Sequence, residues 1–399
     1  MKLLWLYLLA YLFLPIIGEI RLVNENIAIP AGESSWDLIL HNTIFVIVIL
    51  FVAYFVQSYK STLVVRKTRY PQMFIKKVFR RAKFIAAFSI IIIFLLSGYK
   101  VIFEGLNRGE IRSGLGLFGP LYTFLLLYLS MGLIIFISVI YRNLDINKKY
   151  HRKDVFFLYI FAILLGLMSG YKSVTVQLLV PGLVVLYITN IRLLKLIWVV
   201  SAIILVIIFF TMYVRHIGFI DAVDFFIYRI TVMTAYGVIG VWNVFDHPAT
   251  FSDILKNFLG IFGEKIASFL LAISPHEPEF LKTNLSRYIT YLVYPDVEGA
   301  LSNSVNVTVS SFGHAVYLFG KELYYFYALI MGVIIGIFIR FFKKYVMKGC
   351  ALLASLFGTY FFAVILPSLN SGGIFLLVSI PVIFYMFLVF IVIKYFVKG

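Results

Sequence analysis

The sequence contains little charge and almost no cysteine. Asp, Glu, Lys and Arg make up 13% of its 399 residues, against 62% hydrophobic residues, and the mean hydropathy is +1.00. This composition excludes a water-soluble globular domain. The one cysteine, Cys350, excludes an internal disulfide and a thiolate metal site of the C-x-x-C type. Metal-ligand spacings of His, Asp and Glu are also missing, so we expect neither a metal nor a cofactor.

Internal repeats and low-complexity tracts are absent as well. Inverted repeats are a frequent mark of secondary transporters, so their absence weighs against transport. The G-x-G-x-x-G run from Gly114 to Gly119 opens an apolar run and does not follow a strand. This context excludes a dinucleotide site of the Rossmann type.

Long apolar runs are what the sequence has in abundance. About 20 apolar residues cross the roughly 30 Å of hydrocarbon in a bilayer, and ten such runs predict an all-α, polytopic integral membrane protein. The runs cover residues 3–18, 38–57, 85–103, 119–140, 155–171, 173–190, 196–214, 314–339, 350–366 and 374–393. No small-residue cleavage site follows the first run, so we expect an uncleaved anchor there and not a signal peptide.

Basic residues are distributed unevenly between these runs. The net charge is +17. If the N-terminus is cytoplasmic and the ten runs alternate, the cytoplasmic segments hold 23 Lys/Arg and 2 Asp/Glu, and the external segments hold 12 and 16. This is the positive-inside pattern. It predicts cytoplasmic N- and C-termini, and it explains the basic surplus without a nucleic-acid partner.

One large external loop, residues 215–311, separates the seventh run from the eighth. The chain therefore divides into residues 1–214, with seven transmembrane helices and short loops, the large loop, and residues 312–399, with the last three transmembrane helices. This arrangement is typical of a protein that acts on a substrate at the external surface.

Two apolar stretches inside this loop, 223–245 and 254–274, are long enough to span or to lie in the membrane interface. The connection between them, Asp246 to Asp253, holds two acidic residues and no Lys or Arg. Such a connection is poorly suited to the cytoplasm, so we expect external, interfacial helices. The alternative is that both stretches cross the membrane, which gives twelve spans.

Six basic residues run against the acidic character of the external segments. They are Arg108, Arg112, Lys172, Arg215, Arg229 and Arg287. Arg and Lys bind phosphate oxygens through charge-assisted, often bidentate hydrogen bonds, so we predict that the six surround one external cavity and bind a diphosphate. Arg215 and Arg229 are the strongest candidates, because each lies beside long apolar sequence, where a charge is costly. Ion pairs within the 104–114 loop and a snorkelling Lys172 are the structural alternatives.

Polar residues in and after the second half of the loop suit a sugar substrate. Because hydroxyl and amide groups bind sugar hydroxyls, we expect glycan contacts from Tyr288, Tyr291, Tyr294 and Asn303. His314, at the start of the eighth run, is a candidate general base near neutral pH, although a histidine at a helix start more often serves packing. Glu277 is a carboxylate candidate for the same role.

Three short motifs lie at the external ends of the apolar runs. Residues 107–112 (NRGEIR) precede a glycine-rich span, residues 169–173 (SGYKS) join two spans, and residues 311–320 close the large loop. Together with ten to twelve spans, they make most of the chain similar to the Wzy-type oligosaccharide repeat-unit polymerases of bacterial O-antigen, capsule and exopolysaccharide synthesis. Relatives often have an acidic residue in the last motif, where this sequence has His314 or Ala315.

The resemblance implies a metal-independent glycosyltransferase of the GT-C type in the bacterial cytoplasmic (inner) membrane. Its substrate would be a polyprenyl-diphosphate-linked oligosaccharide, and a chain-length regulator would be a further partner. Arg229 and the other cations would stabilise the diphosphate leaving group, with His314 or Glu277 as the base. The alternatives are an O-antigen ligase, which uses the same donor with another acceptor, and a transporter or flippase of the lipid-linked oligosaccharide.

Overall fold

The structure is a computed structural model that describes residues 2–27, 29–59, 68, 70–104, 115–144, 148–169, 172–188, 193–294, 297–301 and 307–398. Helices fill nearly all of these ranges. Extended pairing within them is limited to one isolated bridge between Ile29 and Gly32. The predicted all-α class is confirmed.

Seven helical segments in the described ranges are long and apolar enough to cross a bilayer, by length and composition. They are Lys2–Asn24, Trp36–Ser58, Gln72–Phe103, Gly116–Arg142, Phe219–Val244, Tyr325–Lys348 and Ala351–Asn370. Three shorter apolar helices cover Val174–Leu186, Ile204–Tyr213 and Ile380–Phe396. The chain is therefore a multi-pass membrane protein, and the number of crossings, ten or twelve, stays a prediction.

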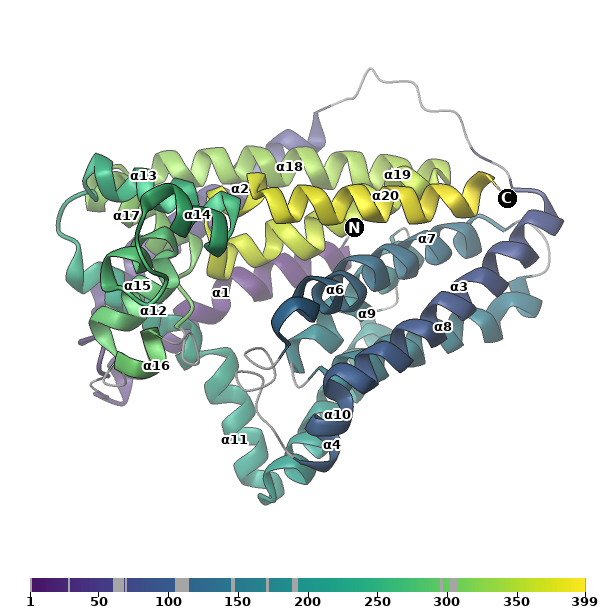
Figure 1. The fold of residues 1–399 in the computed structure, drawn as a ribbon, viewed down its shortest axis with the longest axis horizontal. Coiled ribbons are helices and arrows are strands. Elements are labelled where there is room, and N and C mark those ends of the chain that lie inside the picture. Colours follow the sequence, from purple (N-terminus) through teal and green to yellow (C-terminus); the bar gives the residue numbers. More distant parts are fainter. Residues whose placement is uncertain are drawn as a thin grey trace.

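One group of long helices runs along the long axis of the molecule (Figure 1). It consists of α1 (Lys2–Asn24), α2 (Trp36–Ser58), α18 (Tyr325–Lys348) and α20 (Ile380–Lys398). The helices α2 and α18 approach so closely that a Cβ atom at Gly336 would lie 2.7 Å from the carbonyl oxygen of Ala53, and one at Gly332 2.9 Å from that of Ile49. This G-x-x-x-G spacing brings the two backbones into contact.

A second group of helices is inclined to the first (Figure 1). It consists of α3 (Gln72–Ile93), η1 (Phe94–Gly98), α4 (Tyr99–Phe103), η2 (Gly116–Phe118), α6 (Gly119–Thr123), η3 (Phe124–Leu129), α7 (Ser130–Arg142), α8 (Lys148–Met168), α9 (Lys172–Leu186) and α10 (Leu193–Arg215). The segments η1 and η3 are π-helical. Such segments are rare and are frequent at functional sites.

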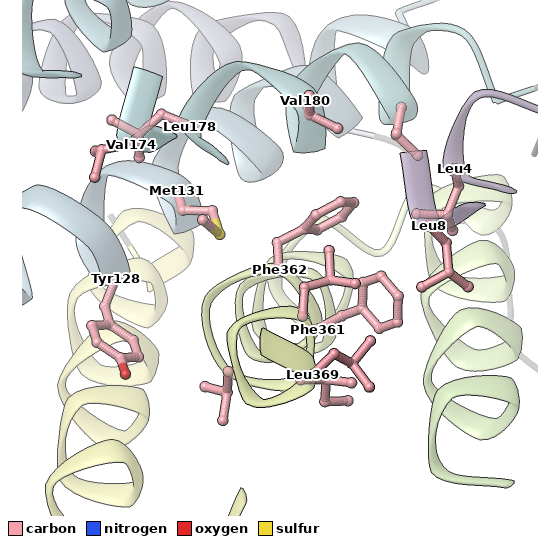
Figure 2. Close-up of a cluster of buried hydrophobic side chains, with 14 of the residues drawn as sticks. Leu4, Leu8, Tyr128, Met131, Val174, Leu178, Val180, Phe361, Phe362 and Leu369 are labelled. Carbon is pink, nitrogen blue, oxygen red and sulfur yellow. The ribbon is translucent and has the colours of Figure 1, made fainter. Parts of the chain in front are cut away.

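A central helix packs against both groups. It is formed by α19 (Ala351–Tyr360) and the π-helical segments η6 (Phe361–Ile365) and η7 (Ser368–Gly372), and the short η8 (Ile374–Val378) follows. Figure 2 shows Phe361 and Phe362 of this helix with Leu8 of α1 on one side and Met131 of α7 on another. These four side chains are almost fully buried. One apolar core therefore joins the two groups.

The remaining helices lead to one end of the molecule. They are α11 (Phe219–Ile230), α12 (Val232–Val244), α13 (Phe251–Leu259), η4 (Gly260–Phe262), α14 (Glu264–Leu271), η5 (Pro278–Thr283), α15 (Leu285–Val293), α16 (Val297–Leu301) and α17 (Ser311–Leu323). The helices from α13 to α17 lie together at the left end in Figure 1. We call them the cap.

The apolar stretch 223–245 differs from the prediction of an interfacial helix in its second half. The stretch is broken at Thr231, and α12 beyond the break is buried against α1, α15 and α17. Glycines allow this packing, because a Cβ at Gly18 would strike the carbonyl of Thr231 and a Cβ at Gly237 that of Thr308. A helix that is apolar on all sides belongs in a core, and α12 is one.

The predicted eighth run, 314–339, is divided between two helices. Gly320 has φ = +77°, a conformation that glycine adopts readily. A Cβ there would lie 2.9 Å from Pro248 Cδ, and the amide of Ala249 donates to the carbonyl of Tyr317 at 2.8 Å. The 248–249 segment therefore contacts the chain at a kink within α17, at Gly320, and the candidate span begins later, at Tyr325.

The end opposite the cap is basic. The amide of Thr68 donates to the Lys348 carbonyl at 2.9 Å, Asn143 Nδ2 donates to the Val346 carbonyl at 3.5 Å, and Arg81 Nη1 donates to the Tyr395 carbonyl at 3.4 Å. These contacts bring together the start of α3 and the ends of α7, α18 and α20. The basic residues of those segments gather at one end, as the charge pattern predicts.

Candidate functional site

Two of the predicted phosphate-binding residues meet at the corner between α10 and α11. The Arg215 guanidinium carbon lies 4.1 Å from the centroid of the Phe225 ring, and that of Arg229 lies 5.5 Å from the same centroid. Both arginines are exposed. Since both distances are measured from one ring, the two cations are close neighbours, although they are separated by 14 positions in the sequence. We call this group the arginine corner.

Local sequence explains how the corner forms. The helix α10 ends at Arg215, His216 takes a left-handed conformation with φ = +53°, and Gly218 is the N-cap of α11. Phe225 and Arg229 are four residues apart on α11 and share one face of that helix. A guanidinium over an aromatic ring presents its flat face to the ring, and its N–H groups lie along its edge.

Apolar side chains are exposed on the side of α11 turned away from the arginine corner. Ile220 is 74% exposed and Ile227 is nearly half exposed, and at about 100° per residue both lie roughly opposite Phe225 and Arg229 on the helix. The ring of Phe219 lies 6.2 Å from that of Phe209, which packs the start of α11 on α10. The exposed apolar side of α11 is suited to contact hydrocarbon.

The structure holds Arg287 in a different place, inside the cap. Its Nη1 lies 2.7 Å from Glu264 Oε1, its Nη2 donates to the Leu301 carbonyl at 2.8 Å, and its side chain is almost fully buried. It thereby ties α14, α15 and α16 together. In Figure 1, α15 lies well apart from α11. Arg287 therefore does not join the arginine corner.

Three other predicted residues, Arg108, Arg112 and Asn303, lie outside the described residues. Lys172 is the first residue of α9, and its side chain lies outside the described part. Their predicted contacts with diphosphate or glycan stay predictions.

Ion pairs hold the outer part of the cap. Lys282 Nζ lies 2.9 Å from Asp253 and 3.2 Å from Glu279, and Lys256 also pairs with Glu279. The hydrogen bond from Lys256 is the main cause that lowers the pKa of Glu279. Partial burial opposes it, and Lys282 adds to it. The Lys282 ammonium lies 5.7 Å from the centroid of the Tyr288 ring.

The predicted glycan-binding tyrosines are carried by α15 and the residue after it. Tyr288, Tyr291 and Tyr294 are all partly exposed, so each has surface that a sugar can contact. Burial raises the pKa of Tyr288, with further effects from the charges around it. Glu277 is exposed in the loop before η5, where its Oε1 accepts the Ser274 amide at 3.1 Å.

His314, the predicted general base, is buried in α17, which lies outside the seven candidate spans. Its ring packs against Gly373, where a Cβ would strike Nδ1, and its Nε2 has no hydrogen-bond partner among the described residues. Burial lowers its pKa from 6.5 to about 3. The imidazole is therefore neutral at physiological pH, and a substrate hydroxyl reaches it only if the surrounding packing opens.

A buried carboxyl group was missed by the sequence analysis. Glu19 is 0% exposed in α1, and its Oε1 accepts a hydrogen bond of 2.7 Å from Asn42 Nδ2 of α2. The predicted first span ended at residue 18, so Glu19 fell in the expected external loop. The helix continues to Asn24 and carries Glu19 inside. A polar Asn in the second apolar run was the available signal.

A second missed group lies at the cap end of α2. His41 Nε2 is 3.5 Å from Asp37, and His41 Nδ1 is 3.0 Å from the Tyr324 hydroxyl. The ring of His41 also contacts Trp242, near the end of α12, at 5.3 Å. Since α12 has 13 residues and is about 20 Å long, this group is too far from Arg229 to share one phosphate with it.

No protein-family model, curated protein or solved structure matches this chain. Among the residues that the structure describes, no three His, Cys, Asp or Glu side chains gather where they could hold a metal ion.

Proposed function

We propose that the protein is a polymerase that joins polyprenyl-diphosphate-linked oligosaccharide repeats into a surface polysaccharide at the external face of the membrane. The observation that carries the proposal is the arginine corner, where Arg215 and Arg229 share the Phe225 ring. Two guanidiniums that share one ring can bind the two phosphoryl groups of one diphosphate. The resemblance to Wzy-type polymerases supports the same substrate.

The chemical step transfers a glycan between two lipid carriers. The acceptor hydroxyl oxygen forms a bond to the anomeric carbon of the donor, and the bond from that carbon to the diphosphate oxygen breaks. The hydroxyl proton passes to a base, and the bonding electrons leave with the polyprenyl diphosphate. Negative charge develops on the leaving group, and preorganised guanidiniums stabilise it without reorganisation. Arg229 and Arg215 take this role.

The lipid and the glycan would contact different parts of the molecule. Exposed Ile220 and Ile227, on the side of α11 opposite Arg229, provide an apolar surface toward the lipid. Tyr288, Tyr291 and Tyr294 of the cap would bind the sugars. His314 or Glu277 would accept the proton, and His314 would do so through Nε2 once the cap has opened.

Helices α13 and α14 fit the predicted interfacial position. Phe251, Leu255 and Phe258 of the first and Ile266 and Phe269 of the second are exposed, while Asp253 and Lys256 are engaged in the ion pairs of the cap. Amphipathic helices with such exposed faces lie at the boundary between headgroups and acyl chains. We place this pair in the external interface.

Transport of the lipid-linked oligosaccharide is the second candidate, and a specific observation favours it. An ionisable residue buried within a membrane helix is often part of a transport pathway, and Glu19 is such a residue. A ligase is the third candidate. It uses the same donor as a polymerase and differs only in the acceptor.

The decisive experiment uses purified protein in detergent with lipid-linked repeats as the only substrate. A polymerase extends the repeats into a ladder although there is no membrane to cross, and a transporter leaves them unchanged. A ligase makes product only when a lipid A–core acceptor is added. Absence of a ladder from well-folded protein, with transport in vesicles, would refute the proposal.

A further inference from the structure

Glu19 has an environment that no ion pair explains. It is fully buried, Asn42 bonds one of its oxygens, and the other, Oε2, has no hydrogen-bond partner among the described residues. No ion pair is formed by Glu19 within that part of the chain either. Since an unpaired carboxylate costs many kcal/mol in an apolar interior and the neutral acid far less, the carboxyl group is stable there as the acid.

The ionisable groups on the neighbouring elements are engaged elsewhere. Arg21 of α1 pairs with Glu25 at 2.8 Å, His41 of α2 contacts Asp37 and Tyr324, Arg229 of α11 packs on Phe225, and His314 of α17 packs against Gly373. Asn42 is the only side chain seen to bond Glu19 in the described ranges. Its amide donates, which suits either the acid or the carboxylate.

A small cavity lies beside Asn42, and Glu19 itself does not line it. Its volume is about 10 Å³, which is at the lower limit for one water molecule. Asn42 lines it together with Ser310, Ser311 and Asn370 and with apolar side chains such as Phe45. Asn42 thus contacts both Glu19 and the cavity.

We propose that Glu19 and Asn42 form a proton-binding site inside the membrane domain. The ligand is the proton itself, bound to Oε2, and Asn42 positions the carboxyl group. The site is independent of the arginine corner and of any glycan chemistry. Its backbone neighbour Gly18 contacts Thr231 at the α11–α12 break, so the site lies between the arginine corner and the cap.

A lipophilic carbodiimide tests the proposal, because such reagents add to the protonated form of carboxyl groups in apolar surroundings. The protein is reconstituted in lipid nanodiscs and labelled over a range of pH, and the modified residue is identified by mass spectrometry. We expect labelling at Glu19 that decreases as the pH rises, and no labelling at this position in Glu19→Gln. Glu25→Gln, which changes an exposed acid just after the end of α1, leaves the profile unchanged.

Asn42→Leu supplies a second measurement. It removes the donor that favours the carboxylate, so the midpoint of the labelling curve moves to higher pH. Labelling of wild-type protein alone tests the site, so the result does not depend on the folding of any variant. Absence of labelling at Glu19 at every pH at which the protein stays folded, or labelling that is insensitive to pH, would overturn the proposal. Protection by Na⁺ at constant pH would also overturn it, because the site would then take a metal cation.

Discussion

The cations of the cap and those of the arginine corner have different surroundings. In the cap, Lys256, Lys282, Arg287 and Lys321 each pair with a carboxylate. In the corner, Arg215 and Arg229 lie over one aromatic ring. A carboxylate accepts hydrogen bonds from a cation and fixes the elements that carry the two charges, whereas a ring contacts the flat face of a guanidinium. The first set therefore maintains structure, and the second is the one to which we assign binding.

The largest expected effect comes from the arginine corner. Arg215→Ala and Arg229→Ala should each reduce polymer formation by at least roughly 100-fold, because each removes a preorganised donor from the leaving group. Polymer ladders from complemented cells and initial rates in detergent are the measurements. The matched control is Arg80→Ala, which removes an exposed arginine on α3 at the basic end. Polymer ladders of wild-type length from both Arg215→Ala and Arg229→Ala would contradict the assignment of binding to the arginine corner.

The next effect concerns stability in the cap. Arg287→Ala leaves Glu264 and the Leu301 carbonyl without their donor, so we expect the free energy of unfolding to fall by about 2 kcal/mol. Thermal unfolding in detergent measures it. Arg215→Ala, whose ring contact is exposed, should leave the unfolding temperature nearly unchanged. Equal losses of stability in both variants would contradict the comparison.

A pH effect follows from His314. Its pKa is lowered to about 3 by burial, so below pH 6.5 the unfolded chain takes up a proton that the folded chain does not. The free energy of unfolding therefore decreases as the pH falls from 6.5 toward 3, by up to about 1.4 kcal/mol per pH unit from this residue. His314→Gln should flatten the dependence of the unfolding temperature on pH in this window. An unchanged slope would show that the imidazole is solvated.

The smallest effect is expected at Glu279. Its pKa is lowered, so its contribution to stability is fully present above pH 4.5 and is lost as the pH falls through its folded value. The side chain is 45% exposed, and solvent limits the contribution to about 1 kcal/mol or less. Glu279→Gln should lower the unfolding temperature slightly at neutral pH and not at all in acid. A large loss at neutral pH would mean that the ion pairs, and not the apolar core, hold the cap.

The sequence predicts the helical class and most of the apolar helices, because a bilayer demands about 20 apolar residues per crossing. It does not predict where helices break. The kink of α17 at Gly320 depends on Pro248 and Ala249, and the burial of α12 depends on Gly18 and Gly237. Each of these contacts joins residues remote in sequence, and a hydropathy pattern contains no information about them.

The arginine corner was predictable in part from the sequence. The cost of a charge beside apolar sequence singles out Arg215 and Arg229, and a short turn brings them together. The pairing of Arg287 with Glu264 depends on the fold of the cap, so the sequence could not separate a structural arginine from a binding one. Glu19 was missed because α1 continues six residues beyond its apolar run, from residue 18 to Asn24.

The π-helical turn at Phe361–Ile365 has a consequence for insertions and deletions. A π turn holds one residue more than an α turn. Loss of one residue inside this turn would let it close as ordinary α-helix, with the residues on either side still facing the same neighbours. Loss of one residue in α19 before it would rotate every later side chain, Leu369 included, by about 100°. The central helix should therefore accept a change of length at this turn and reject it one turn earlier.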